Sequence, residues 1–153
     1  MERKLELKDI AGYFPYGLRC KIGESFYDFD LKVADNWFGC YDKVNIFLRP
    51  LSDLYKTITH NGKEIIPIVE LAKITFPLCE YWKLSDERTE AFSCNYGRFY
   101  FENGGFCIED EERYVTNQYQ LFNYLNELKI DYRGLIESGL AVSVYDLEDN
   151  PYK

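Results

Sequence analysis

The feature that most constrains the fold of this chain is a turn signal between two aromatic-rich segments. The segment 91–101 is rich in aromatic residues, Asn103 and Gly104 follow it, and an apolar run occupies 106–108. Asn-Gly favours a two-residue turn in which both residues have positive φ, and such a turn joins two antiparallel strands. The sequence therefore predicts a β-hairpin here, with a bulge at Gly97, where the alternation of side chains slips.

Earlier and later segments add further strands. Residues 18–22 and 26–33 alternate apolar and polar side chains, as half-buried strands do. Residues 45–48 are a third candidate before Pro50, and 141–145 are a candidate for the last strand. In 26–33 this interpretation places Phe29, Leu31 and Val33 on one face of the strand.

Helical spacing predicts several short helices. An amphipathic segment over 5–14 ends in the turn-forming Pro15-Tyr16-Gly17, and Pro67 fits the first turn of a helix over 67–73. A longer helix follows Thr116 or Asn117 as its N-cap, and a short one over 132–138 ends at Gly139. The apolar stripe of the longer helix contains Tyr119, Leu121, Phe122, Leu125 and Leu128.

The segment that starts at Ser52 has two interpretations. Ser52 and Asp53 can cap a helix that ends at Asn61-Gly62, and this is the preferred prediction. The alternative is a hairpin that turns at Asn61-Gly62, because Thr57-Ile58-Thr59 favours a strand. Most strands are joined by short links, which favours an α+β fold: one domain over 1–153, with a mainly antiparallel sheet and several short helices packed on one face.

The charge balance limits the class of partner. The chain has 26 acidic and 18 basic side chains, which gives a net charge of −8. Phosphate backbones require positive contacts, so we expect no direct binding to nucleic acid and none to membranes, whereas a protein with a basic face is compatible. The N-terminal residues show no signal peptide, and the five cysteines form no close pair. This pattern predicts a cytoplasmic protein with free thiols, and the resemblance described below implies a bacterial host cell.

Motifs for catalysis and metal binding are sparse. His60 is the only histidine, and it is a candidate general base only if a cysteine lies beside it in the fold. The short signatures of hydrolases, zinc enzymes and nucleotide-binding proteins do not occur. The chain is therefore expected to have no catalytic residue, no metal and no cofactor, although an enzyme with a carboxylate site or a Cys–His pair remains an alternative.

Aromatic side chains make up 18% of the chain, and these offer the candidate binding residues. Much of this content belongs in the core, but tyrosine with one apolar and one polar end suits an interface. An acidic run lies close by in the sequence, and a basic protein partner suits such a surface. The candidate binding residues are Tyr81, Trp82, Tyr96, Tyr100, Glu109, Asp110, Glu111 and Glu112.

Two stretches carry a family resemblance. The first comprises residues 49–55, 60–64 and 68–73, and the second comprises 117, 122–125, 131–137 and 139–141. Together they resemble small uncharacterised proteins encoded by phages and prophages of gut anaerobes. That family has no assigned activity, so the resemblance implies no functional residue; it implies a mobile-element context, in which small proteins often act by binding other proteins.

The preferred functional hypothesis is a non-enzymatic accessory module of a phage or mobile element that binds a protein. Three alternatives stay open. An acidic mimic of nucleic acid would carry carboxylates spaced along one face, and a virion component would form a higher oligomer. A small enzyme would place His60 or paired acids inside a deep pocket.

Overall fold

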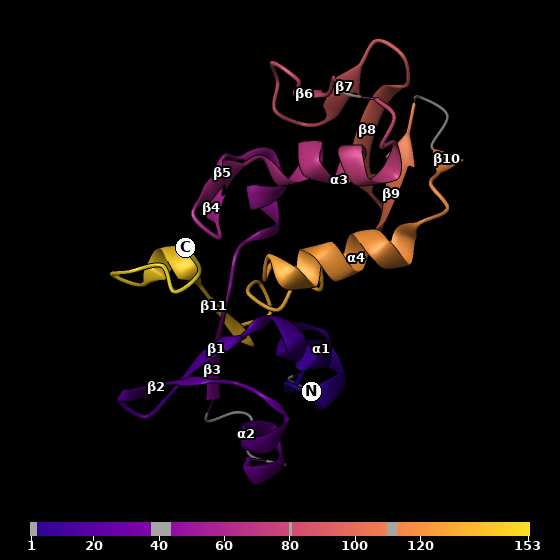
Figure 1. Ribbon diagram of the computed structural model, residues 1–153. Coiled ribbons are helices and arrows are strands. Elements are labelled where there is room, and N and C mark those ends of the chain that lie inside the picture. Colours follow the sequence, from indigo (N-terminus) through magenta and orange to yellow (C-terminus); the bar gives the residue numbers. More distant parts are fainter. Residues whose placement is uncertain (1–2, 38–43, 80, 110–112) are drawn as a thin grey trace. The chain divides into compact units, whose positions relative to one another are not determined.

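A computed structural model describes residues 3–37, 44–79, 81–109 and 113–153 of the chain (Figure 1). The chain is α+β with mainly antiparallel strands, as the sequence predicts. It divides into two compact units. Unit 1 contains Met1–Leu51 and Leu125–Tyr152, and unit 2 contains Ser52–Tyr124 together with Lys153. The single domain over 1–153 stays a prediction.

Unit 1 is built on a four-stranded sheet in the order β11-β3-β1-β2. Strand β1 pairs antiparallel with β2 and β3, whereas β11 runs parallel to β3. The strands are β1 (Arg19–Ile22), β2 (Ser25–Asp28), β3 (Val44–Leu48) and β11 (Ala141–Ser143). The helices are α1 (Leu7–Ile10), the 3-10 helix η1 (Ala11–Tyr16), α2 (Leu31–Asn36) and the 3-10 helix η4 (Val144–Asp146).

Two predictions in unit 1 are wrong in part. The strand predicted over 26–33 ends at Asp28, and helix α2 begins at Leu31 because Asp30 caps it by accepting a hydrogen bond from the Val33 N–H at 3.0 Å. The alternation of apolar residues in 26–33 predicted a continuous strand because it gives no information about the helix cap at Asp30. The helix predicted over 132–138 is a set of turns, since the buried Asp131 carboxylate accepts hydrogen bonds from the backbone N–H groups of Leu135 and Ile136.

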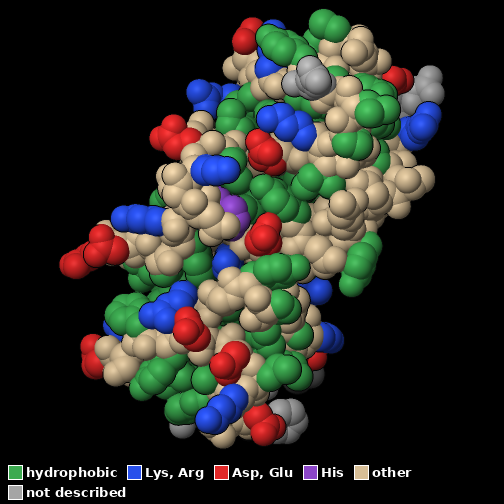
Figure 2. Space-filling model, viewed as in Figure 1, with side chains coloured by type: hydrophobic (Ala, Val, Ile, Leu, Met, Phe, Trp, Pro, Cys, Tyr) green, Lys and Arg blue, Asp and Glu red, His purple; other side chains and the backbone are tan. Residues whose placement is uncertain are grey.

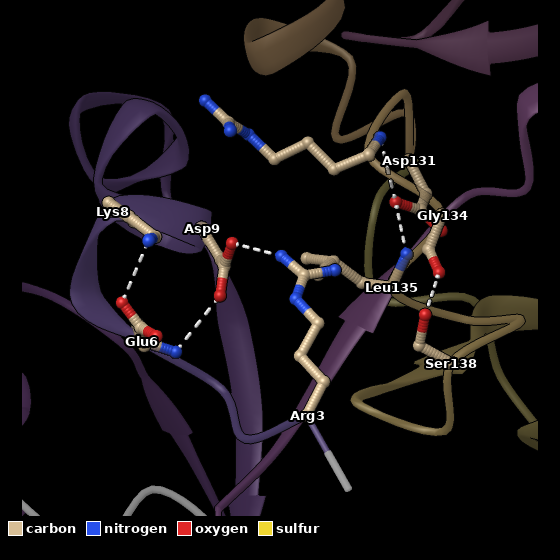
Figure 3. A network of polar contacts seen from close by, with 9 residues as sticks. Arg3, Glu6, Lys8, Asp9, Asp131, Gly134, Leu135 and Ser138 are labelled. Atoms are coloured by element: carbon tan, nitrogen blue, oxygen red, sulfur yellow. Dashed lines mark hydrogen bonds and ion pairs between the residues drawn. The ribbon is translucent and has the colours of Figure 1, made fainter. Parts of the chain in front are cut away.

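Buried carboxylates organise unit 1 at two places (Figure 3). Asp9 is buried and accepts a hydrogen bond from the Arg3 guanidinium at 2.5 Å and from the Glu6 N–H at 3.0 Å. Lys8 pairs with the Glu6 carboxylate at 3.0 Å. A buried charge is tolerated only when it is paired or hydrogen-bonded, and Asp9 and Asp131 both meet this condition.

The C-terminal residues of unit 1 are held by the side chain of Tyr152. Its hydroxyl donates a hydrogen bond to the Phe47 carbonyl at 2.8 Å and accepts one from the Arg19 N–H at 2.7 Å. The Arg49 guanidinium donates to the Tyr152 carbonyl, and the Lys129 ammonium lies 5.1 Å from the centre of the Tyr152 ring. One aromatic side chain therefore joins the C-terminus to two strands of the sheet.

Unit 2 contains a five-stranded antiparallel sheet in the order β10-β9-β8-β7-β6 and a separate β4-β5 hairpin. The strands are β4 (Ile58–His60), β5 (Lys63–Ile65), β6 (Lys83–Leu84), β7 (Ala91–Ser93), β8 (Gly97–Glu102), β9 (Gly105–Ile108) and β10 (Arg113–Tyr114). The helices are the 3-10 helix η3 (Leu51–Tyr55), α3 (Pro67–Thr75) and α4 (Gln118–Glu127). The last residues of α4, from Leu125, belong to unit 1.

Asn-Gly sequences form both two-residue turns of unit 2. Asn103 and Gly104 have φ values of 51° and 77° and join β8 to β9, so the predicted hairpin is confirmed. Asn61 and Gly62, with φ values of 51° and 78°, join β4 to β5. The helix preferred for residues 52–60 is therefore wrong beyond Tyr55, and the alternative hairpin is the observed structure.

The bulge predicted at Gly97 is a turn in the structure. It pairs with Ser93 and closes a tight turn between β7 and β8, with a φ of 84°. The segment predicted as one strand with a bulge is therefore two strands. The slip in alternation was real, but it marked a reversal of the chain, which the positive φ of glycine allows.

Candidate binding surface

Residues 74–79 and 114–126 are two of several segments without a charged side chain, in a chain of which 29% is charged. Residues 74–79 follow the body of α3, and residues 114–126 contain the end of β10 and nearly all of α4. On the exposed side, the second segment presents Tyr119, which is 83% exposed, and Tyr114, Thr116 and Gln120. We call these four exposed residues the neutral face.

Figure 2 shows the same property on the surface. Over the N-terminal half of α4, at the right of the view, the atoms are tan and green without red or blue. On most other parts of this view, acidic and basic side chains alternate. Protein interfaces are depleted of charged residues at their centres and enriched in tyrosine, so this composition favours a contact surface.

A hollow of about 380 Å³ lies beside the neutral face. Its apolar lining comes from Ile74, Phe76, Pro77, Ile108 and Val115. Its polar lining comes from Thr75, Thr116, Asn117, Gln120, Tyr114 and Arg113. Arg113 is the one charged residue among the described residues that line it, and it is exposed. The hollow therefore suits an apolar side chain with hydrogen-bonding groups around it.

The side chain of Gln118 fixes the start of α4 against the sheet. Its amide nitrogen donates to the Phe106 carbonyl at 2.7 Å and to the Val115 carbonyl at 2.9 Å. Its amide oxygen accepts from the Phe106 N–H at 2.9 Å. A β-carbon at Gly105 would lie 2.7 Å from the Tyr114 ring, so the missing side chain of Gly105 leaves room for Tyr114 on the neutral face.

The two charge-free segments are joined at the hollow by a direct hydrogen bond. The Asn117 amide donates to the Thr75 hydroxyl at 3.2 Å, and this hydroxyl donates to the Leu71 carbonyl at 3.0 Å. The C-terminal turn of α3 is thereby tied to the N-terminal turn of α4. Because both segments are anchored, the hollow between them has a defined shape before any ligand arrives.

An aromatic stack stands behind one wall of the hollow. The ring of Phe76, which lines the hollow, lies 4.3 Å from the ring of Tyr96 and 5.8 Å from that of Trp82, measured between centroids. The Trp82 and Tyr96 rings are 6.1 Å apart and nearly parallel. These distances are typical of favourable aromatic packing, so Trp82 and Tyr96 hold the ring of Phe76 in place.

The aromatic residues predicted to bind a partner differ in their exposure to solvent. Tyr81 is 69% exposed, whereas Trp82 is only 7% exposed and Tyr96 is half-buried. The indole N–H of Trp82 has no hydrogen-bond partner among the described residues. The structure brings Trp82 and Tyr96 together within the stack, where they support Phe76, and it leaves Tyr81 available at the surface.

Tyr100 and Glu109 meet at another place on the sheet. The Tyr100 hydroxyl donates to the Glu109 carbonyl at 2.9 Å, and the Arg98 guanidinium lies 5.5 Å from the Tyr100 ring centre. The carboxylate residue Glu109 is exposed, with a positive φ of 64°. The remaining acidic candidates, Asp110, Glu111 and Glu112, lie outside the described residues.

The groups considered for catalysis include the histidine and the described cysteines. His60 is half-buried at the end of β4, where its Nε2 lies 3.3 Å from the amide nitrogen of Asn61. Cys20, Cys79 and Cys107 are buried, and burial raises the pKa of the Cys20 thiol to about 11, so this thiol is a weak nucleophile at neutral pH. No group of three or more His, Cys, Asp or Glu among the described residues is arranged to hold a metal ion.

No protein-family model, curated protein or solved structure matches the chain. The resemblance to phage-encoded proteins therefore stays a prediction. None of the helices in the described ranges has the length and apolar character needed to cross a lipid bilayer.

The neutral face was missed from the sequence for an identifiable reason. The apolar stripe predicted for this helix includes Tyr119, but the structure leaves Tyr119 83% exposed, so it does not pack with the buried leucines of the stripe. The rest of the stripe is correct at Leu121, Leu125 and Leu128, which are buried. The signal that was available is the absence of Asp, Glu, Lys and Arg from 114 to 126 in a highly charged chain.

Proposed function

We propose that this chain is a non-enzymatic binding module that contacts a protein partner through the neutral face. The observation that carries the proposal is the exposure of Tyr119, at 83%, on a helix whose surface has no charged residue before Glu127. An exposed tyrosine beside a formed hollow offers a large contact area at a small entropic cost. The accessory role in a phage or mobile element belongs to the same proposal and is supported by the sequence resemblance alone.

A neutral contact surface differs from the acidic surface expected from the sequence in its response to salt. Ionic strength weakens attraction between exposed opposite charges, because the Debye length falls to about 3 Å at 1 M salt. A complex formed through uncharged tyrosine, threonine and glutamine side chains has no such attraction to lose. Binding through the neutral face should therefore persist at high salt, whereas binding of a basic partner to exposed carboxylates should fail.

The experiment is affinity purification of the tagged chain from its host, at low and high salt and with nuclease. The test variant is Tyr119→Glu, and the matched control is Tyr27→Glu, which adds the same charge at an exposed tyrosine in unit 1. We expect one stoichiometric protein that survives nuclease and high salt, is retained by the control, and is lost with Tyr119→Glu. Retention of that protein by Tyr119→Glu, or its loss with salt or nuclease, would refute the proposal.

A further inference from the structure

The hydroxyl of Tyr152 lies within the ladder between β1 and β3 of unit 1. In the register of these strands Cys20 faces Ile46, so the next pair along the ladder is Arg19 and Phe47. The hydroxyl bridges this pair, because it accepts a hydrogen bond from the Arg19 N–H at 2.7 Å and donates one to the Phe47 carbonyl at 2.8 Å. The sheet therefore presents one donor and one acceptor at a spacing that admits a hydroxyl group.

Other strands hold the two backbone groups in position. Arg19 also pairs with Asp28 of β2, and Phe47 also pairs with Val142 of β11. In the strand order β11-β3-β1-β2 these partners lie on the sides away from the Tyr152 hydroxyl. The donor and the acceptor are therefore preorganised, and an occupant with a hydroxyl group satisfies both of them.

Apolar and cationic side chains surround the rest of Tyr152. Phe47 and Val144 are each 2% exposed and form one apolar cluster with its ring. The ammonium of the buried Lys129 lies 5.1 Å from the ring centre, which favours a cation–π contact, and the Arg49 guanidinium donates to the Tyr152 carbonyl. Burial raises the pKa of the Tyr152 phenol, so the hydroxyl keeps its proton and can donate. We call this site the tyrosine slot, since it binds a ring, a terminal hydroxyl and a peptide carbonyl.

The segment that brings Tyr152 into the slot is otherwise at the surface. Residues 145–151 are exposed except for the half-buried Leu147 and Asn150. From 146 to 151 the hydrogen bonds of the described structure stay within the segment: the Leu147 N–H donates to the Val144 carbonyl, and the Asn150 side chain accepts from the Tyr152 N–H. Leu147 packs against the edge of the same apolar cluster. Tyr152 is therefore the main anchor, and local opening of this segment empties the slot without unfolding the sheet.

We propose that the slot is a recognition site for the tyrosine side chain of another protein, and that Tyr152 occupies it from within the chain. When the segment 147–152 moves out, the Arg19 N–H, the Phe47 carbonyl and the Lys129 ammonium bind the second tyrosine in its place. A partner binds only the fraction of molecules whose slot is open, so its apparent affinity is reduced by that fraction. The slot belongs to unit 1 and the neutral face to unit 2, so this inference stands without the proposed function.

The test uses Tyr152→Ala, which empties the slot, and p-cresol, which is the tyrosine side chain as a free molecule. We expect p-cresol to raise the thermal unfolding midpoint of this variant saturably. It should bind at least about tenfold more tightly than toluene, because only p-cresol satisfies the Arg19 N–H and the Phe47 carbonyl. The unchanged chain and Tyr145→Ala, a matched substitution at an exposed tyrosine of the same segment, should not respond to p-cresol. Equal affinity for the two probes, no shift with p-cresol, or an equal shift in the unchanged chain overturns the inference.

A second variant tests the same site if Tyr152→Ala does not fold. Tyr152→Phe keeps the ring and removes only the hydroxyl, so the internal occupant is held more weakly. N-acetyl-L-tyrosinamide should therefore bind this variant at least about tenfold more tightly than it binds the unchanged chain. The Arg19 amide resonance in an NMR titration reports its entry, because this N–H bonds the hydroxyl in the slot. Equal affinity for the two chains, or equal binding of N-acetyl-L-phenylalaninamide by Tyr152→Phe, contradicts the proposed site.

Discussion

Unit 1 and unit 2 are stabilised by different kinds of contact. Unit 1 has buried charged side chains: Asp9 and Asp131 bind residues close to them in the sequence, and Arg49 binds the distant Tyr152. The Tyr152 hydroxyl in turn makes hydrogen bonds to two strands. Unit 2 relies on stacked aromatic rings and two Asn-Gly hairpins, and it leaves Leu78, Tyr81 and Tyr119 exposed. Unit 1 also exposes apolar and aromatic side chains, among them Phe26, Tyr27 and Leu31, so unit 2 differs in having its exposed Tyr119 within a long run of residues without charge.

The largest effect should come from breaking the contacts that hold the C-terminus of unit 1. Tyr152→Phe removes the hydroxyl that donates a hydrogen bond to the Phe47 carbonyl and accepts one from the Arg19 N–H. Leaving a buried polar group unpaired costs about 1–3 kcal/mol, so we expect the free energy of unfolding to fall by about 2–4 kcal/mol. Urea unfolding followed by circular dichroism measures this change.

Tyr119→Phe is the control for that substitution, because it removes a hydroxyl from an exposed tyrosine of unit 2. It should change stability by less than about 0.5 kcal/mol. A loss below 1 kcal/mol for Tyr152→Phe would contradict the role of buried hydrogen bonds in unit 1.

The next effect concerns the anchor of α4 in unit 2. Gln118→Leu keeps a side chain of similar size but removes three hydrogen bonds to Phe106 and Val115. We expect a loss of about 1–3 kcal/mol in the free energy of unfolding, because the Phe106 and Val115 groups lose partners. Since Val115 also lines the hollow, retention of the co-purifying protein should weaken as well.

Gln120→Leu is the matched control, because Gln120 lies on the same helix but is exposed. It should leave the free energy of unfolding within about 0.5 kcal/mol of the unchanged chain. Equal losses for the two variants would show that Gln118 does not anchor the helix.

Alkaline pH should destabilise unit 1 through its buried acids. Burial raises the pKa of the Cys20 thiol from its ordinary value of 9.0 to about 11 and raises the pKa of Tyr13 well above its ordinary value. In the unfolded chain these groups lose their protons first, so the stability linked to Cys20 is fully present below pH 9 and is lost as pH rises through 11. The loss linked to Tyr13 begins only above its ordinary pKa of 10.0. Burial lowers the pKa of Lys129, which acts in the opposite direction but involves one group.

Unfolding midpoints in urea measured from pH 8 to pH 11 should therefore fall steadily once the pH passes the ordinary pKa of the thiol. Cys20→Ala should reduce the slope of this fall, because it removes one of the shifted groups. A flat profile over this range would contradict the burial of Cys20 and Tyr13 in the folded state.

The smallest effect is a difference in thiol reactivity between the two units. Cys94 is exposed in the turn of unit 2, whereas Cys20 is buried in unit 1 and its pKa is raised. We expect alkylation at pH 7 to modify Cys94 at least tenfold faster than Cys20, because the thiolate is the reactive form. Peptide mapping after timed quenching identifies each site, and equal rates would contradict the burial of the Cys20 thiol.

Local signals in the sequence predicted those parts of the fold that depend on neighbouring residues. Pro67 at a helix start, Asn103-Gly104 in a turn and the alternation of 18–22 each specify a backbone conformation without help from distant contacts. The division into two units and the parallel pairing of β11 with β3 depend on contacts between residues far apart in sequence. No local pattern encodes such contacts.

The candidate site was harder to predict, for two physical reasons. A stripe of apolar residues does not say which aromatic residue at its edge is buried, and Tyr119 lies outside the buried side of α4. The hollow arises because Asn117 and Thr75, which are distant in sequence, are joined by a hydrogen bond. The exposed Tyr81 was identified from sequence, but the charge-free surface became visible only when α3 and α4 were placed together within unit 2.

The proposed binding occurs at the neutral face and not at the exposed Glu109. The most direct measurement is the retention of the co-purifying protein across a salt series by Tyr119→Glu and by Glu109→Gln. We expect the Tyr119→Glu variant to lose the co-purifying protein at every salt concentration. The Glu109→Gln variant and the unchanged chain should retain it. Loss of the protein with Glu109→Gln or with rising salt, together with retention by Tyr119→Glu, would contradict the claim.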